Sequence, residues 1–159
     1  MDSRDKIYSP TALQNQLAQW KDQGDKIVFT NGCFDLVHLG HVDYLEKARK
    51  LGDRLVIGLN SDDSVAQLKG AGRPIIDEQS RARILAAMEF VDAVVLFGEE
   101  TPYHMIGAVV PDILVKGDDY LAEDIVGSDI VSNNGGQVVT IPLVKGYSTS
   151  EIIEKIRTK

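Results

Sequence analysis

Residues 30–41 read Thr-Asn-Gly-Cys-Phe-Asp-Leu-Val-His-Leu-Gly-His, and this stretch decides the fold. It follows the apolar run Ile27–Phe29 and precedes a helical pattern from Val42 to Leu51. The order predicts a strand, a tight turn and the N-terminus of a helix. A helix N-terminus offers unpaired backbone N–H groups and the positive end of the helix dipole, so the stretch predicts a phosphate-binding site.

Two histidines stand at the first turn of this predicted helix. His38 and His41 are three residues apart and therefore lie on nearly the same face. Gly40 between them has no side chain, so a polyphosphate can approach the backbone while both imidazoles donate to its oxygens. The alternative is a pair of capping or core histidines beside an unrelated glycine turn. The combination of strand, Gly32, Phe34-Asp35 and helix favours the phosphate site.

Residues 32–41 resemble the first motif of the HxGH nucleotidyltransferases, a superfamily that includes cytidylyltransferases, adenylyltransferases and class I aminoacyl-tRNA synthetases. The resemblance implies that His38 and His41 are catalytic, and that Lys69 assists them. It also implies a nucleotide-binding role for Gly32, Cys33, Phe34 and Gly40. Cys33 is the only cysteine, so it forms no internal disulfide, and we expect its backbone to matter more than its sulfur.

Composition indicates one soluble domain. The chain has 159 residues, 43% of them hydrophobic and 26% charged, which fits a single domain over 1–159 with an N-terminal helical extension at 1–24. No apolar run approaches the ~20 residues of a membrane helix, and the N-terminus lacks a signal-peptide core. We expect a cytoplasmic protein that does not bind a membrane.

The formal net charge of −7 argues against a broad nucleic-acid-binding surface. A polyanionic substrate must then meet local cations in loops and at helix starts. The candidates are Lys69, Arg73, Arg81, Arg83, Lys116 and Lys145.

Strand and helix patterns alternate along the chain. Strands are expected at 26–30, 54–59, 92–97, 111–115 and 137–141, and helices at 9–24, 40–51, 78–90, 101–109, 125–132 and 151–157. This alternation predicts an α/β fold, a Rossmann-like doubly wound five-stranded parallel sheet without hinge or repeat. Ligands of such sheets bind beyond the carboxyl ends of the strands, where residues 30–41, 116–120 and 146–150 should converge.

Three further segments allow two interpretations each. The loop 68–74 is either a mobile connection or an anion clamp built on Lys69 and Arg73. Residues 116–120 form either a solvated turn or a binding loop in which Lys116 meets an acceptor phosphate. Ser148-Thr149 either caps the last helix or resembles the second nucleotidyltransferase motif. In the glycerol-3-phosphate enzymes an Arg-Thr pair precedes that motif, whereas Leu143-Val144 stand here.

The chain as a whole resembles the D-glycero-D-manno-heptose 1-phosphate adenylyltransferases, in their stand-alone form. The motifs in common include residues 60–65, 68–70, 111–117 and 148–149, although Gly117-Asp118-Asp119 replaces the frequent Gly-Gly-Asp. The resemblance implies transfer of AMP from ATP to the heptose 1-phosphate, giving ADP-heptose and pyrophosphate for the lipopolysaccharide inner core. It also implies a homodimer or higher homo-oligomer.

The same resemblance assigns the remaining site residues. It places Asp118, Tyr147, Ser148 and Thr149 at the nucleotide, and the substrate set is Asp35, Arg73, Arg81, Lys116 and Asp119. Mg²⁺ is expected to arrive on the nucleotide phosphates, with no protein ligand assigned, although Asp35 offers a contact through water. Two alternatives stay open: an enzyme that makes CDP-glycerol, and a non-catalytic nucleotide-binding module.

Overall fold

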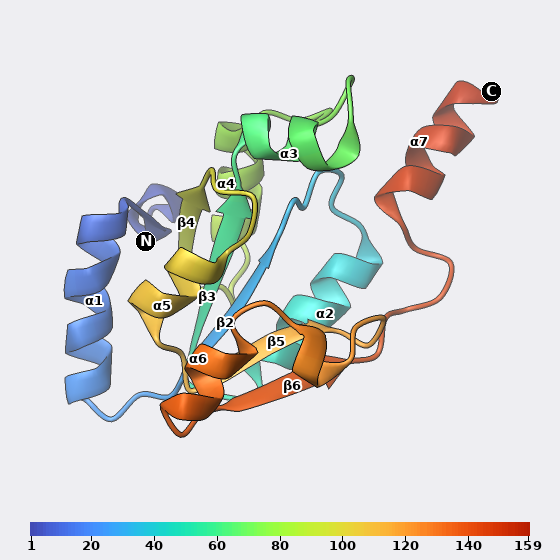
Figure 1. Cartoon of the computed structure of the whole chain (residues 1–159). Coiled ribbons are helices and arrows are strands. Elements are labelled where there is room, and N and C mark those ends of the chain that lie inside the picture. Colours follow the sequence, from blue (N-terminus) through green and yellow to red (C-terminus); the bar gives the residue numbers. More distant parts are fainter.

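Six parallel strands form one sheet in the computed structural model, which describes residues 1–159 (Figure 1). The strands are β1 (Ile7–Tyr8), β2 (Ile27–Gly32), β3 (Arg54–Asn60), β4 (Ala93–Phe97), β5 (Ile113–Gly117) and β6 (Gln137–Ile141). Their order in the sheet is β1-β4-β3-β2-β5-β6, and every neighbouring pair is parallel. The chain therefore winds outward from β2 in one direction and then from β5 in the other, so the switch point lies between these two strands.

Helices fill the connections. They are α1 (Pro10–Asp22), α2 (Leu39–Arg49), α3 (Asp62–Lys69), α4 (Glu78–Ala86), α5 (Tyr103–Val109), α6 (Ser128–Asn133) and α7 (Thr149–Arg157), with 3-10 turns at Ser3–Lys6 and Ala122–Asp124. Short polar residues begin several of them: Ser9 Oγ accepts from Ala12 N, Ser61 Oγ from Ser64 N and Asp77 Oδ1 from Ser80 N.

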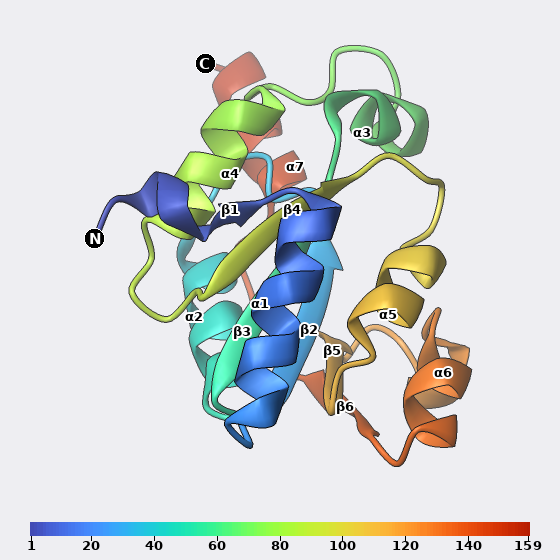
Figure 2. The same ribbon diagram turned by 90° about the vertical axis from the view of Figure 1, so that its left-hand side faces the viewer.

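Each face of the sheet has its own core. On one face Leu45 of α2 and Leu85 of α4 pack against alternate residues of β2 and β3. On the other face Leu17 of α1, Ile106 of α5 and Val131 of α6 pack against the remaining alternate residues. Figure 2 shows α1 crossing in front of the central strands. Burial on both faces explains why these strands read as nearly continuous apolar runs.

The doubly wound parallel sheet is confirmed, but the expected count of five strands was wrong. The sixth strand, β1, is two residues long and pairs with β4 at the edge, so the segment 1–24 is not wholly helical. The helix expected at 125–132 begins only at Ser128, because Gly127 adopts a φ of 89° that interrupts it. The helix expected to reach Phe90 ends at Ala86.

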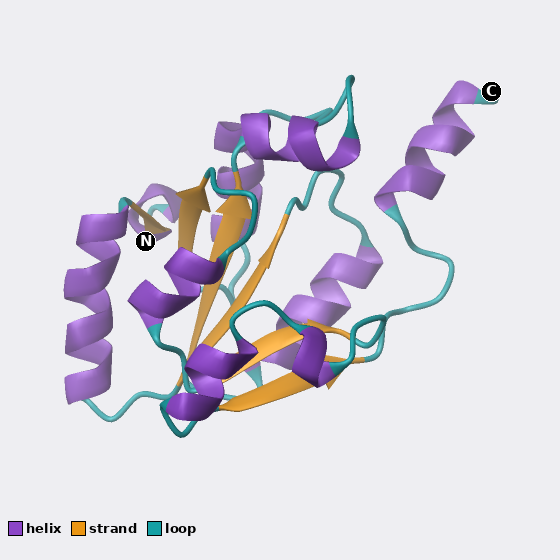
Figure 3. Ribbon diagram, viewed as in Figure 1, coloured by secondary structure: helices purple, strands orange, loops and turns teal.

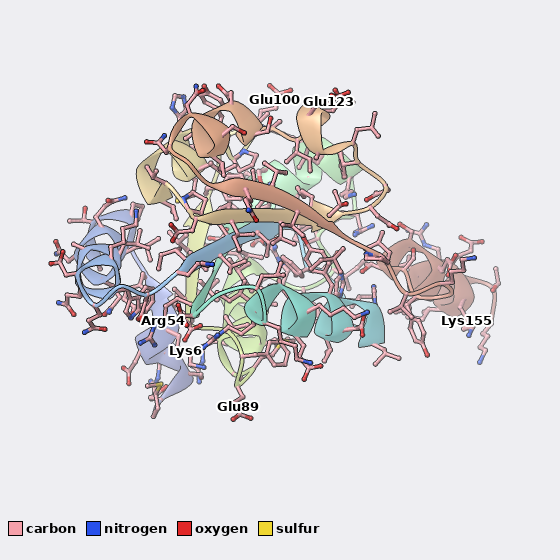
Figure 4. The ribbon with its side chains drawn as sticks, turned by 90° about the horizontal axis from the view of Figure 1, so that it is seen from below. Lys6, Arg54, Glu89, Glu100, Glu123 and Lys155 are labelled. Atoms are coloured by element: carbon pink, nitrogen blue, oxygen red, sulfur yellow. The ribbon has the colours of Figure 1, made fainter.

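The last helix differs from the others in its packing. No residue of α7 is buried, and a long loop after β6 carries the helix away from the sheet (Figures 1 and 3). Lys155 extends from α7 at the side of the molecule opposite Lys6 and Arg54 (Figure 4). None of the helices has both the length and the apolar composition needed to cross a membrane.

Candidate active site

A cavity of about 600 Å³ opens at the carboxyl ends of the strands, within the usual size range for small-ligand sites. The turn after β2 and the first turn of α2 form part of its wall. The end of α3, the connection between β4 and α5, the segment before α6 and the beginning of α7 complete it. Residues that lie far apart in the sequence therefore meet here, as the strand-end argument predicted.

His38 and His41 line this cavity with their rings stacked, 3.8 Å between centroids. His38 is the N-cap residue of α2, and its backbone N–H donates to His41 Nδ1 at 3.3 Å. Because Nδ1 accepts, the proton of neutral His41 must be on Nε2, which makes Nε2 the donor. Burial, and then the nearby His38, lower the pKa of His41 to about 4, so this imidazole is neutral at pH 7.

Two glycines make room for this arrangement. A Cβ at Gly40 would lie 2.9 Å from His38 Cε1, and a Cβ at Gly32 would lie 2.9 Å from Phe34 Cε2. Phe34 is nearly buried and adopts a φ of 47°, an uncommon value for a residue with a side chain. Its ring lies 5.3 Å from that of His41. The turn thus packs against the two histidines, and all five of these residues line the cavity.

Asp35 anchors the loop that carries Lys69 and Arg73, here called the basic loop, to the same turn. Its buried carboxylate accepts hydrogen bonds from Ile75 N, Ile76 N and Arg73 Nε at 2.8–2.9 Å. These bonds hold the pKa of Asp35 below its usual value despite the opposing effect of burial, which is the largest single influence. The carboxylate therefore holds the loop in the folded chain, and the substrate role and the water-mediated metal contact expected of Asp35 stay predictions.

The loop that Asp35 anchors brings two cations to the cavity. Lys69 ends α3, and Arg73 engages Asp35 through Nε alone, which leaves its two terminal nitrogens without a protein partner. Both residues line the cavity. The geometry supports the anion clamp over the mobile connection.

The beginning of α7 lies against the beginning of α2. Thr149 Oγ1 donates to Leu36 O at 3.1 Å, and the Tyr147 ring is stacked 6.2 Å from that of His38. Ser148 Oγ caps the helix by accepting from Glu151 N at 3.2 Å. Tyr147, Ser148 and Thr149 all line the cavity. Two helix N-termini, each the positive end of a dipole, thus share one cavity.

Residues 116–119, at the carboxyl end of β5 and just beyond it, take two different positions. Lys116 lines the cavity, its Nζ donates to Asn31 O at 3.4 Å, and desolvation lowers its pKa. Asp118 and Asp119 are exposed and lie outside the cavity wall, where an Asp118 carboxylate oxygen accepts from Leu143 N at 3.3 Å. The nucleotide contact expected of Asp118 and the substrate contact expected of Asp119 stay predictions.

Arg81 lies beneath the site and not in it. Its side chain is fully buried and donates to Ile76 O, Cys33 O, Asn60 O and an Asp62 carboxylate oxygen, all at 2.7–2.9 Å. The expected substrate contact is therefore replaced by a structural one, because the guanidinium holds the turn after β2 against the end of β3. Cys33 lines the cavity, and burial raises the pKa of its thiol, so the thiol is not activated.

Two asparagines in the cavity wall were not identified from the sequence. Asn31 and Asn60 stand at the carboxyl ends of β2 and β3. A polar residue that ends an apolar strand was the available signal, but the sequence alone does not say whether such a side chain faces the site or the next helix.

No group of three or more His, Cys, Asp and Glu side chains is placed to hold a metal ion. Asp35, the one acidic residue of the turn, is occupied by its loop contacts.

Comparisons with known proteins identify the family of the chain. A family model described as cytidylyltransferase-like matches residues 29–155. The bifunctional protein HldE of Methylobacillus flagellatus is 55% identical over 152 residues, 96% of this chain and 31% of that protein. HldE of Magnetococcus marinus is 54% identical over 155 residues, 98% of this chain and 32% of that protein.

The chain thus spans about a third of the length of these curated relatives. Among solved structures, the lipopolysaccharide core biosynthesis protein of Thermoplasma volcanium is 33% identical with a TM-score of 0.62, covering 79% of this chain and all of that one. The family model covers the histidine turn, the basic loop and the start of the last helix. The chain therefore belongs to the cytidylyltransferase-like family and is a nucleotidyltransferase.

Proposed function

We propose that this chain transfers AMP from ATP to D-glycero-β-D-manno-heptose 1-phosphate, giving ADP-heptose and pyrophosphate. The observation that carries the proposal is the pair of helix N-termini, of α2 with its histidines and of α7 with its hydroxyls, that face one cavity. The resemblance to the heptose 1-phosphate adenylyltransferases, with the identity to the HldE proteins, supports this acceptor. The name of the Thermoplasma neighbour supports a step in lipopolysaccharide core synthesis.

The proposed reaction needs no general base. A sugar 1-phosphate is ionised at neutral pH, so its oxygen attacks the α-phosphorus of ATP directly, and the bond to the β-phosphate oxygen breaks as pyrophosphate leaves. The site must align this displacement and stabilise the charge that develops. His41 Nε2–H, His38 and the backbone N–H groups at the start of α7 are the donors for the nucleotide phosphates. Lys69 and Arg73 meet the departing pyrophosphate, and Lys116 meets the acceptor phosphate.

Mg²⁺ enters this proposal as part of the nucleotide substrate and supplies further neutralisation of phosphate charge. A homodimer rests on the family resemblance alone, and sedimentation of the purified chain tests it. We place the enzyme in the cytoplasm, where ATP is available.

A pyrophosphate-release assay that crosses ATP and CTP with heptose 1-phosphate and glycerol 3-phosphate tests the function. We expect release only with ATP and heptose 1-phosphate, and loss of release when Mg²⁺ is chelated. Release with CTP and glycerol 3-phosphate would replace the proposal by CDP-glycerol synthesis. ATP binding without release in any combination would leave a non-catalytic module.

A further inference from the structure

Asn31 and Asn60 line the cavity but have no role in the phosphate chemistry above. Asn31 is paired across the sheet with Gly58, and Asn60 lies two residues further along β3, so both side chains project from the same face. That face also carries Phe29 and Val56 and is covered by α1, α5 and α6, whereas α2 packs on the other face. Both amides therefore line the cavity from the opposite face of the sheet to the one on which α2 and its histidines lie.

The amide of Asn60 is fixed in orientation. Ser64 Oγ donates its hydrogen to Ser61 O at 3.2 Å, so it must accept from Asn60 Nδ2, which lies 3.0 Å away. Asn60 Oδ1 then faces away from Ser64 and has no protein partner. The residue is only 3% exposed, and Arg81 Nη1 holds its backbone oxygen at 2.9 Å. A rigid, largely desolvated acceptor in a cavity wall calls for a donor from a ligand.

Asn31 connects the hydrogen-bonding oxygen of Asn60 with the expected position of the substrate phosphate. Its side-chain oxygen is also buried without a hydrogen-bond partner. Its backbone oxygen accepts from Nζ of Lys116, the cation to which we assign the acceptor phosphate. A group attached to that phosphate therefore lies within reach of both amides.

The chemistry of the two oxygens restricts the ligand group. Asn60 Oδ1 accepts only, and a phosphate, with a second pKa of about 6, has no hydrogen to donate at neutral pH. Leu143, Val144 and Tyr147, which follow β6, give another part of the cavity wall an apolar surface that suits the flat face of adenine. Hydroxyl groups of a sugar are donors of the required kind, and the contact of Asn31 O with Lys116, to which we assign the acceptor phosphate, favours those of the acceptor over those of the ribose. Glu100, labelled in Figure 4, also lines the cavity.

We propose, on the basis of the function proposed above, that Asn60, with Asn31 beside it, forms the hydroxyl-binding site for the sugar of the acceptor. Asn60 Oδ1 accepts a hydrogen bond from a sugar hydroxyl, and the site selects a polyhydroxylated phosphate over a simple one.

Asn60→Ala and Asn31→Ala test the proposal, with Asn133→Ala on the exposed surface of α6 as the matched control. Calorimetry measures the binding of α,β-methylene-ATP, and then of heptose 1-phosphate to the complex with that analogue. We expect the affinity for heptose 1-phosphate to fall about 10- to 100-fold in Asn60→Ala, the loss expected for one buried hydrogen bond. A smaller loss is expected in Asn31→Ala, and the affinity for the ATP analogue should stay within about twofold of wild type in both.

A lost affinity for the ATP analogue with unchanged binding of heptose 1-phosphate would show that the amides read the nucleotide and would overturn the inference. Equal losses of both affinities, or no loss, would overturn it as well. If Asn60→Ala fails to fold, Asn31→Ala decides, because its side chain makes no hydrogen bond in the folded chain. Turnover of wild type with heptose 1-phosphate tests the proposed function separately; if wild type uses another sugar phosphate, that compound replaces heptose 1-phosphate in the titrations.

Discussion

Gly40 keeps open the space that the His38 imidazole occupies. In Gly40→Ala the new Cβ would lie 2.9 Å from His38 Cε1 and 3.0 Å from His38 Nδ1, so the ring must move. Alanine also favours a helix by about 1 kcal/mol over glycine. We therefore expect turnover to fall about 100-fold, as when one transition-state donor is lost, while the free energy of unfolding stays equal or rises. Steady-state kinetics and urea denaturation measure the two quantities, and unchanged turnover would show that the position of His38 is not critical.

His41 gives the stability of the ligand-free protein a pH dependence. Its pKa is about 4 in the folded chain, against 6.5 as the ordinary value. Between these pH values the unfolded chain binds more protons than the folded chain. The contribution of His41 to the free energy of unfolding is therefore fully present above pH 6.5 and is lost as the pH falls toward 4. Since His41 is partly accessible, we expect a loss of about 1–2 kcal/mol in wild type that His41→Asn lacks.

Urea denaturation at a series of pH values from 7 to 4.5 measures this difference. His104→Asn, at an exposed position in α5, is the control and should retain the wild-type slope. Parallel curves for wild type and His41→Asn would contradict the buried, neutral imidazole.

Single residues show how far the sequence could be read. The spacing of His38, Gly40 and His41 was enough to place them at one helix start, because helix geometry is local. The roles of Asp35 and Arg81 were not readable, since they depend on where residues 60, 62 and 75–76 return in space. Asn60 was missed for the same reason.

At the scale of elements, Arg81 joins four segments through one buried guanidinium. Arg81→Met removes its hydrogen bonds and leaves Cys33 O and Asn60 O without these donors. We expect a loss of about 3–5 kcal/mol in the free energy of unfolding, the usual result of breaking a buried charged network. Chemical denaturation measures it. Arg83 is exposed, and its guanidinium makes one hydrogen bond, to Ser3 Oγ, so Arg83→Met should change stability by less than about 0.5 kcal/mol. Similar losses in both variants would refute the role of Arg81.

The last helix serves the site and adds little to the core. No residue of α7 is buried, and Thr149 Oγ1 to Leu36 O is its hydrogen bond to the turn before α2. Deletion of residues 149–159 should therefore leave the thermal midpoint within about 4 °C of wild type, which corresponds to less than about 1 kcal/mol. The affinity for ATP should fall at least tenfold, because one of the two helix N-termini is gone. Deletion of 158–159 alone is the control, and unchanged ATP affinity in the longer deletion would separate α7 from the site.

The elements themselves were largely predictable. Buried parallel strands with apolar runs and capped helices carry local signals, and the expected and observed strand bounds differ by few residues. The edge strand β1 was missed because two residues carry no pattern, and the break at Gly127 depends on a φ that the sequence does not reveal.

At the scale of the whole molecule, the sheet order places the site. Because the winding reverses between β2 and β5, the ends of these strands diverge and leave the cavity into which the turn after β2, the basic loop and α7 project. Convergence at the carboxyl ends was predictable from the alternation of strands and helices. The exposed positions of Asp118 and Asp119 were not, because they depend on the path of the chain after β5.

The central claim is that the two helix N-termini hold the nucleotide between them. A crystal structure of the chain with α,β-methylene-ATP and Mg²⁺ tests it most directly. We predict triphosphate oxygens within hydrogen-bond distance of His41 Nε2 and of the backbone N–H groups at the start of α7, with the metal ion on the phosphates. A triphosphate bound away from either helix start would contradict the account.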